Sequence, residues 1–183
     1  MNGLYRTFRS LWLRRGDSDF DYVSIGDVNE NGLIDASDIS VAATRIGDGV
    51  YEKPENTIDG TITIAADKKN YKAGEEVVIT ISGKGLANVN AFGLALPYDV
   101  SEYEYVGIEA IGTGNMANYS KNRLHTNGET VIYPTFINEG NQDTISGDIE
   151  LVKVTLKAKK NVKFNLKAVD GVIVDKHLNT VKF

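Results

Sequence analysis

Hydrophobic and polar residues alternate strictly over most of the chain from about Thr61 to the C-terminus. The clearest runs are VVITI at 77–81, FGLALPY at 92–98, VKVTLKA at 152–158 and FNLKA at 164–168. A period of two places every second side chain on one face of a strand, and Gly, Asn and Asp separate the runs. The pattern predicts about nine short strands and requires no helix, which is typical of a β-sandwich.

The same alternation predicts which side chains of two late strands are buried. The apolar residues expected in the core are Val152, Val154, Leu156, Phe164 and Leu166. The lysines between them are expected on a solvated outer face, where they discourage edge-to-edge pairing.

The first fifty residues follow a helical pattern instead. In the segment 3–16, the apolar residues Leu4, Phe8, Leu11 and Trp12 recur at helical spacing. A second apolar stripe consists of Ile39, Ala42, Ala43 and Ile46. Helical spacing predicts two helices, the second capped by Asp38 and ended by Gly47. Because residues 47–60 are rich in Gly, Pro, Asp and Asn, we expect a helical region at 1–50, a linker at 51–60 and a β region at 61–183.

The stretch with the most specific chemistry is DVNENGLIDASD at 27–38. Its positions 1, 3, 5, 7, 9 and 12 supply oxygen donors: Asp27, Asn29, Asn31, the carbonyl of Leu33, Asp35 and Asp38. Gly32 stands at position 6, where the chain must turn sharply. This spacing predicts an EF-hand type loop that binds Ca²⁺, with Asp35 acting through a water. The alternative is a polar turn that binds no ion.

A second acidic run precedes this loop and contains Asp17, Asp19 and Asp21. It lacks both the glycine and the distal acid of a calcium loop. We therefore expect an acidic linker that also caps a helix.

The loop and its short Ala/Ile helix resemble a dockerin, the calcium-dependent docking module of secreted bacterial polysaccharide-degrading systems. Dockerins carry two such loops, and the segment 3–16 is similar to the exit helix of the first. The chain thus resembles a half dockerin or a fragment of a longer protein. The resemblance implies a protein partner near position 12, at Ala36 and Ser37.

The region 61–183 resembles a cohesin. The similarity rests on KKNYKAGEEVVITISGKGLANVNAFGLALPYD, then YEYVGIEAIGTG, TVIYPTFINEG and SGDIELVKVTLKAK. It implies a nine-stranded jelly-roll sandwich, and together with the dockerin resemblance it implies that a small helical calcium-binding region precedes this sandwich. It also implies a partner: a cohesin or dockerin of another secreted protein, or packing of the two regions on each other.

Composition argues against catalysis and nucleic-acid binding. The chain has no cysteine, and its two histidines, His125 and His177, are far apart and outside any zinc spacing. Nothing provides a nucleophile with its base or a pair of carboxylates across a cleft. Because the net charge is −5, with an acidic stretch at 16–52, we also expect no nucleic-acid partner.

We therefore expect a non-catalytic, calcium-dependent assembly region of a larger secreted carbohydrate-active enzyme. A carbohydrate-binding module and a rigid, self-packed spacer remain as alternatives. Aromatic residues supply the glycan candidates: Tyr98, Tyr103, Tyr105, Tyr119, Tyr133 and Phe136. The resemblance places the protein outside the cell or on its surface, although no signal peptide or membrane span is expected from the sequence.

Overall fold

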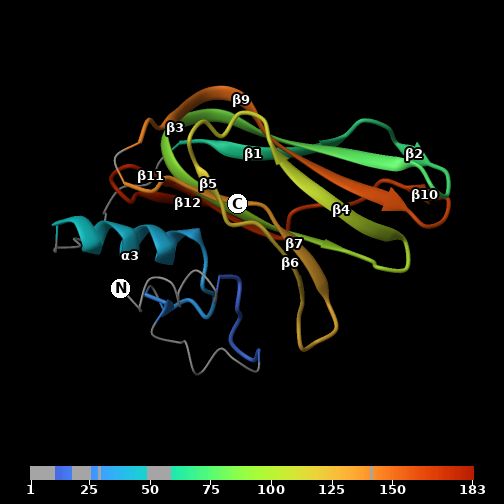
Figure 1. Ribbon diagram of the computed structural model, residues 1–183, viewed down its shortest axis with the longest axis horizontal. Coiled ribbons are helices and arrows are strands. Elements are labelled where there is room, and N and C mark those ends of the chain that lie inside the picture. The colour runs from blue at the N-terminus through green and yellow to red at the C-terminus, as the bar shows by residue number, and fades with distance from the viewer. Residues whose placement is uncertain (1–10, 18–25, 29, 49–58, 141) are drawn as a thin grey trace.

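The computed structural model describes residues 11–17, 26–28, 30–48, 59–140 and 142–183. This part of the chain contains one α-helix, α3 (Ala36–Asp48), and twelve strands. The strands of the first half are β1 (Thr61–Ala66), β2 (Asn70–Tyr71), β3 (Glu76–Tyr98), β4 (Tyr103–Ala110), β5 (Ala117–Asn118) and β6 (Lys121–Leu124). The others are β7 (Thr130–Tyr133), β8 (Thr135–Ile137), β9 (Ile145–Ala158), β10 (Val162–Lys163), β11 (Asp170–Asp175) and β12 (Thr180–Lys182). Figure 1 shows α3 outside the strands, beside β11.

Strand β3 connects the two layers of the sandwich. Its first half pairs with β1 and β9, and β9 also pairs with β4. Its second half pairs with β11, β8 and β7, while β12 and β6 extend this layer at its edges. The register between β3 and β9 shifts between Ile81 and Val89. Gly85, with a φ of +60°, lies in this irregular stretch, where the chain bends from one layer into the other.

The main core lies between these layers, as the alternation predicted. Val152, Val154 and Leu156 of β9 are fully buried, as are Val77, Ile79 and Ile81 on the part of β3 that pairs with β9 in the same layer. Phe164 and Leu166 are half-buried and pack against the same cluster. The mainly β fold and its inward-facing residues were therefore predicted correctly.

The expected number of nine strands was wrong. One of the nine expected strands, TVIYPTFI at 130–137, is divided at Pro134, which has no N–H to continue a ladder, into β7 and β8. Two other expected strands join to form β3. Residues 164–169 alternate in exposure but form no strand, because Phe164 and Val169 donate isolated backbone hydrogen bonds to Lys69 and Ala95.

The helical region also differs from expectation. Residues 1–10 lie outside the described part, but the helix expected over 3–16 does not include residues 11–16. Trp12 has a φ of +68°, and its N–H donates to the Ile34 carbonyl, with 2.6 Å between N and O. Arg14 forms an antiparallel bridge with Leu33. The backbone groups of Trp12, Leu13 and Arg15 are thus paired with the loop 27–38 and not within a helical turn.

Helix α3 begins at Ala36 and ends at Asp48, so Gly47 lies inside it. The side chains of Ala43 and Ile46 lie outside the described residues. Most of the expected linker, 51–58, also lies outside them. Among the helices that the structure describes, none is long and apolar enough to cross a membrane.

Candidate functional site

The acidic loop is ordered by its own side chains. Asp27 is buried, and its carboxylate accepts hydrogen bonds from the backbone N–H groups of Asn31 (3.0 Å) and Gly32 (2.8 Å). Gly32 has a φ of +88°, the left-handed conformation predicted for position 6. The Asn31 side chain accepts from the Leu33 N–H at 2.8 Å. The loop therefore folds around Asp27 through backbone donors.

Two further acids begin helix α3. Asp35 precedes the first helical residue and accepts from the Ser37 N–H at 2.8 Å, while its own N–H donates to Asp38 at 2.9 Å. Asp35 is thus the N-cap, and the arrangement is a variant of the capping box in which the N-cap carboxylate accepts from N2 and not from N3. The expectation that Asp38 is the cap was wrong: it lies in the first turn, where its carboxylate also accepts from the Val28 N–H at 2.8 Å.

Burial gives this part of the loop an unusual electrostatic character. Asp35 is 3% exposed and Asp38 is fully buried. Burial, and then the neighbouring charge of Asp38, raise the pKa of Asp35 to about 7. Oxygen-rich, buried acidic surroundings of this kind suit a divalent cation, which would offset the adjacent negative charges.

The predicted calcium ligands are not all assembled by the described structure. In the described ranges, no group of three or more His, Cys, Asp or Glu side chains could hold a metal ion. Asn29 lies outside those ranges. Asn31 and Leu33 would bind an ion through an amide oxygen and a backbone carbonyl oxygen, which are not among these side-chain types. Calcium binding at the loop thus stays a prediction.

The expected partner contacts, Ala36 and Ser37, lie at the start of α3. Ala36 is fully buried and packs with residues of the sandwich, and Ser37 is half-buried. In this structure Ala36 therefore contacts the sandwich of its own chain and not a separate protein.

The centre of the contact between the two regions is Trp12, which is 1% exposed. Its ring stacks on Tyr133 with 4.4 Å between centroids, and its indole N–H donates to the Thr135 hydroxyl at 2.7 Å. A Cβ added at Gly93 would lie 2.7 Å from Trp12 Cζ2. The glycine of β3 thus leaves the room that the indole ring fills.

Around Trp12, a second apolar cluster lies outside the main core. Leu11, Trp12, Ala36, Ile39 and Val41 pack on side chains that we call the apolar outer face. These are Ala91, Ala95, Val131, Tyr133, Ile137, Val172, Val174 and Leu178. They belong to β3, β7, β8 and β11 or follow β11 directly. We call residues 11–17, 26–28 and 30–48 together the N-terminal segment, which covers this face.

Polar contacts surround the apolar cluster on the side of β6 and β7. Asp17 lies 3.0 Å from His125 Nδ1 and accepts from the Thr126 hydroxyl at 2.9 Å. Since an ionised carboxylate only accepts, Nδ1 carries the proton, and Nε2 accepts from the Tyr133 hydroxyl at 2.6 Å. Burial raises the pKa of Tyr133 to about 12, which keeps this hydroxyl a donor.

Two arginines add further links. Arg14 of the N-terminal segment pairs with Glu129 at 2.9 Å. Arg123 of β6 donates to the Leu11 carbonyl at 3.3 Å. The N-terminal segment is therefore held by apolar burial and by directed polar contacts.

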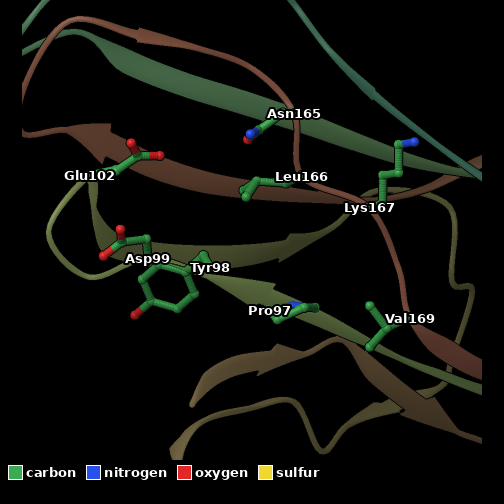
Figure 2. Close-up of a pocket in the computed structure, with 8 residues that line it drawn as sticks. All are labelled: Pro97, Tyr98, Asp99, Glu102, Asn165, Leu166, Lys167 and Val169. Atoms are coloured by element: carbon green, nitrogen blue, oxygen red, sulfur yellow. The ribbon is translucent and has the colours of Figure 1, made fainter. Parts of the chain in front are cut away.

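A separate groove lies where β3 ends. It has a volume of about 480 Å³, and Figure 2 shows the side chains that line it: Pro97, Tyr98, Asp99, Glu102, Asn165, Leu166, Lys167 and Val169. Tyr98 is half-buried, and its hydroxyl lies 3.1 Å from the Asn122 amide nitrogen. Tyr103, Tyr133 and Phe136 are fully buried, and Tyr105 packs on the core. Of the aromatic glycan candidates, Tyr98 is thus the one in this groove.

Sequence reasoning missed the residues that join the two regions. His125 and Asp17 are 108 positions apart, and Trp12 and Thr135 are 123 apart. The available signal was Gly93, a glycine within a strongly alternating strand, which often marks the close approach of another group.

Comparisons with known proteins agree with this fold. The family model of the cohesin domain matches residues 48–182, well over half of the chain. One similar structure is the cohesin module of a Clostridium perfringens family 33 glycoside hydrolase, with 19% identity and a TM-score of 0.50 over 68% of this chain and 93% of that one. No curated protein matches the chain.

Two other similar structures are cohesins of Clostridium thermocellum in type I cohesin–dockerin complexes. The OlpC cohesin has 17% identity and a TM-score of 0.53, over 71% of this chain and 91% of that one. The OlpA cohesin has 14% identity and a TM-score of 0.51, over 66% and 91%.

At these identities the solved structures show the fold alone. The family match covers the sandwich but not residues 1–47, whose dockerin-like character remains a prediction from the sequence. The chain belongs to the cohesin family, and it is a non-catalytic binding module.

Proposed function

We propose that this chain is a protein–protein assembly module whose apolar outer face receives a dockerin-like element, a calcium loop followed by a short helix. The cohesin fold supports this proposal, as do the two similar cohesins that were crystallised with dockerins. The observation that carries it is that Trp12, Ala36 and Ile39 pack on the apolar outer face of the sandwich. A sheet that buries apolar side chains on both of its faces needs a partner for the outer one.

The element now in that place is the chain's own N-terminal segment. We propose the boundaries 1–50 for the helical region to which this segment belongs, 51–60 for the linker and 61–183 for the sandwich. This arrangement accommodates two of the expected partners, an outside dockerin and the chain itself.

Calcium would bind at the loop of the N-terminal segment. The residues that would hold it are Asp27, Asn29, Asn31, Leu33, Asp35 and Asp38. The ion would supply positive charge beside the buried acids Asp35 and Asp38. Asp27 and Asp38 would meanwhile keep the loop backbone in place through the hydrogen bonds they accept.

The parent protein would be a secreted or surface-attached carbohydrate-active enzyme. One similar structure is a module of a glycoside hydrolase, which supports this assignment. The module would then hold components together or separate a catalytic domain from the cell.

The test is capture of partners by the full chain and by a Trp12→Ala variant, in calcium and in chelator. Proteins from the secreted and surface fractions would be identified by mass spectrometry. We expect calcium-dependent capture of a dockerin-carrying protein, stronger with the variant because its face is less well covered. If neither chain captures such a protein in calcium while both are folded, the docking role is wrong and a rigid spacer is favoured.

A second candidate function is glycan binding at the Tyr98 groove. The groove is lined by the Tyr98 ring, which Figure 2 shows beside Asp99, and by the carboxylate, amide and ammonium groups of other residues. A pyranose can stack its apolar side on such a ring and form hydrogen bonds at its edge. Tyr98→Ala should remove binding on a glycan array, whereas Tyr98→Phe, which keeps the ring, should retain most of it. An array without any ligand for the parent chain would exclude this function.

A further inference from the structure

We infer that the N-terminal segment closes the apolar outer face in cis, and that an opened face binds the N-terminal segment of a second copy of this chain. The inference rests on the proposed function, because it assumes that the face receives a loop–helix element. It adds to that function one occupant of the face, the N-terminal segment of a second copy, and a means of controlling access, which is coverage of the face by the chain's own segment.

The face is shaped for Trp12. Gly93 provides the space for its ring, Tyr133 stacks on it, and the fully buried Thr135 accepts its N–H. Without the segment, the face would present a contiguous set of aliphatic and aromatic side chains to water. Surfaces of this kind attract a partner of complementary shape.

The polar contacts fix the orientation of the occupant. Arg14 pairs with Glu129, Asp17 meets His125 and Thr126, and the Leu11 carbonyl accepts from Arg123. An occupant from another chain must therefore offer a tryptophan, a positively charged side chain two positions later and a carboxylate five positions later, as Trp12, Arg14 and Asp17 do. The N-terminal segment of a second copy offers all three at the required spacing.

The tether explains why the face is closed within one chain. A covalently linked segment competes at a high effective concentration against any segment in solution. Binding in trans is therefore favoured only where the cis contact is weakened in one chain and the segment is intact in another. Exchange of an identical element between copies then uses the contacts of the closed monomer.

Two full-length variants separate donor from receptor. Trp12→Ala removes the indole ring from the segment and leaves intact the space beside Gly93 that receives it, so this chain can act only as the receptor. Gly93→Ala leaves Trp12 intact but places a methyl group where the ring should lie. Gly107→Ala is the matched control, since a Cβ there meets nothing within 4 Å.

The experiment is to mix the two variants in calcium and to measure molar mass by sedimentation together with tryptophan fluorescence. The chain has a single tryptophan, so in the mixture all indole emission comes from the Gly93→Ala chain. We expect each variant alone to be monomeric, and the mixture to form a 1:1 dimer with blue-shifted, quencher-protected emission. The Gly107→Ala chain, mixed with Trp12→Ala, should stay monomeric.

Folding of each variant is checked by circular dichroism. If Gly93→Ala alone still buries Trp12, Gly93→Val takes its place and fills more of the space that receives the ring. Folded variants that remain monomeric with exposed indole in the mixture would overturn the inference. Calcium-dependent capture of a dockerin-carrying protein by Trp12→Ala would in that case leave the proposed function standing, so the two failures are distinguishable.

Discussion

At the scale of single residues, the contact between the two regions depends on how a buried polar atom is satisfied. The indole N–H of Trp12 has the Thr135 hydroxyl as its acceptor, and both residues are nearly or fully buried. A buried donor without an acceptor loses its hydrogen bonds to water and gains nothing in return. Thr135 should therefore matter more for docking than its size implies.

Replacing Thr135 with Val should weaken docking of the N-terminal segment by about 1–3 kcal/mol, because the shape is kept while the acceptor is lost. Thr135→Ser keeps the hydroxyl and should lose less. The measurement is a urea titration followed by the fluorescence of Trp12, the sole tryptophan. Equal midpoints for the Val and Ser variants would show that the hydrogen bond does not contribute.

Asp17 makes docking sensitive to acid. Burial opposes its ionisation, but hydrogen bonds from the Arg14 N–H, the Thr126 hydroxyl and His125 outweigh this effect and hold the pKa of Asp17 below its ordinary 3.8. A carboxylate whose pKa is lowered by folding contributes stability that is complete above the ordinary value. That stability is lost as the pH falls through the lowered pKa.

We therefore expect the Trp12 signal of the parent chain to lose protection below about pH 4, and the Asp17→Asn variant to lose this part of the pH dependence. The measurement is acrylamide quenching of Trp12 from pH 7 to pH 2. The control is Asp99→Asn, because the pKa of Asp99 is lowered by the Ser101 N–H in a turn of the sandwich. If both variants follow the same pH curve as the parent, Asp17 does not hold the segment.

At the scale of elements, α3 depends on its first turn. Its N-cap, Asp35, satisfies the Ser37 N–H, and Asp38 satisfies the N–H of Asp35 in return. The same two carboxylates are predicted calcium ligands. A cap accepts from backbone donors whether or not an ion is bound, so its two roles can be separated by substitution.

Asp35→Ser should keep the cap, and with it α3, but should weaken calcium binding, because serine replaces a charged ligand. Asp35→Ala should lose both, at a cost of about 0.5–2 kcal/mol to the docked helix. Far-ultraviolet circular dichroism with calcium titration by calorimetry measures the two effects. Unchanged calcium affinity in the Ser variant would remove Asp35 from the ligand set.

The strands were easier to predict than the helices, for a physical reason. The alternation in β9 follows directly from one buried and one exposed face, so Val152, Val154 and Leu156 could be assigned to the core. Strand ends depend on backbone pairing, and the sequence does not show which strands are adjacent. This is why the merger of two expected strands into β3 was missed.

At the scale of the whole molecule, the sequence indicated two regions and left their packing on each other as one alternative, but it did not identify the residues that make the contact. Trp12 belonged to an apolar stripe with helical spacing, and such a stripe is compatible with any apolar partner. Its actual partners, Gly93, Tyr133 and Thr135, come together only when the sandwich folds. The loop 27–38, in contrast, is local, and its turn at Gly32 was predicted correctly.

The molecule thus consists of a sandwich with its own core and a segment that docks on its outer face, and the two should differ in their response to calcium. Asp27 belongs only to the segment, where it accepts from Asn31 and Gly32. An ion that binds the docked loop alone, at one hundred times its dissociation constant, adds about 2.7 kcal/mol to the docked state. The sandwich core does not share in this linkage.

Asp27→Ala should therefore lower the denaturant midpoint of the Trp12 signal and abolish its shift with calcium, while the strand signal in circular dichroism keeps its midpoint. Asp143→Ala, outside the loop, serves as the control and should leave the calcium shift intact. Because the main core lies between the two layers of the sandwich and not under the apolar outer face, loss of the segment exposes the outer face without opening that core. An Asp27→Ala chain that melts and binds calcium as the parent does would show that Asp27 neither holds an ion nor keeps the segment docked.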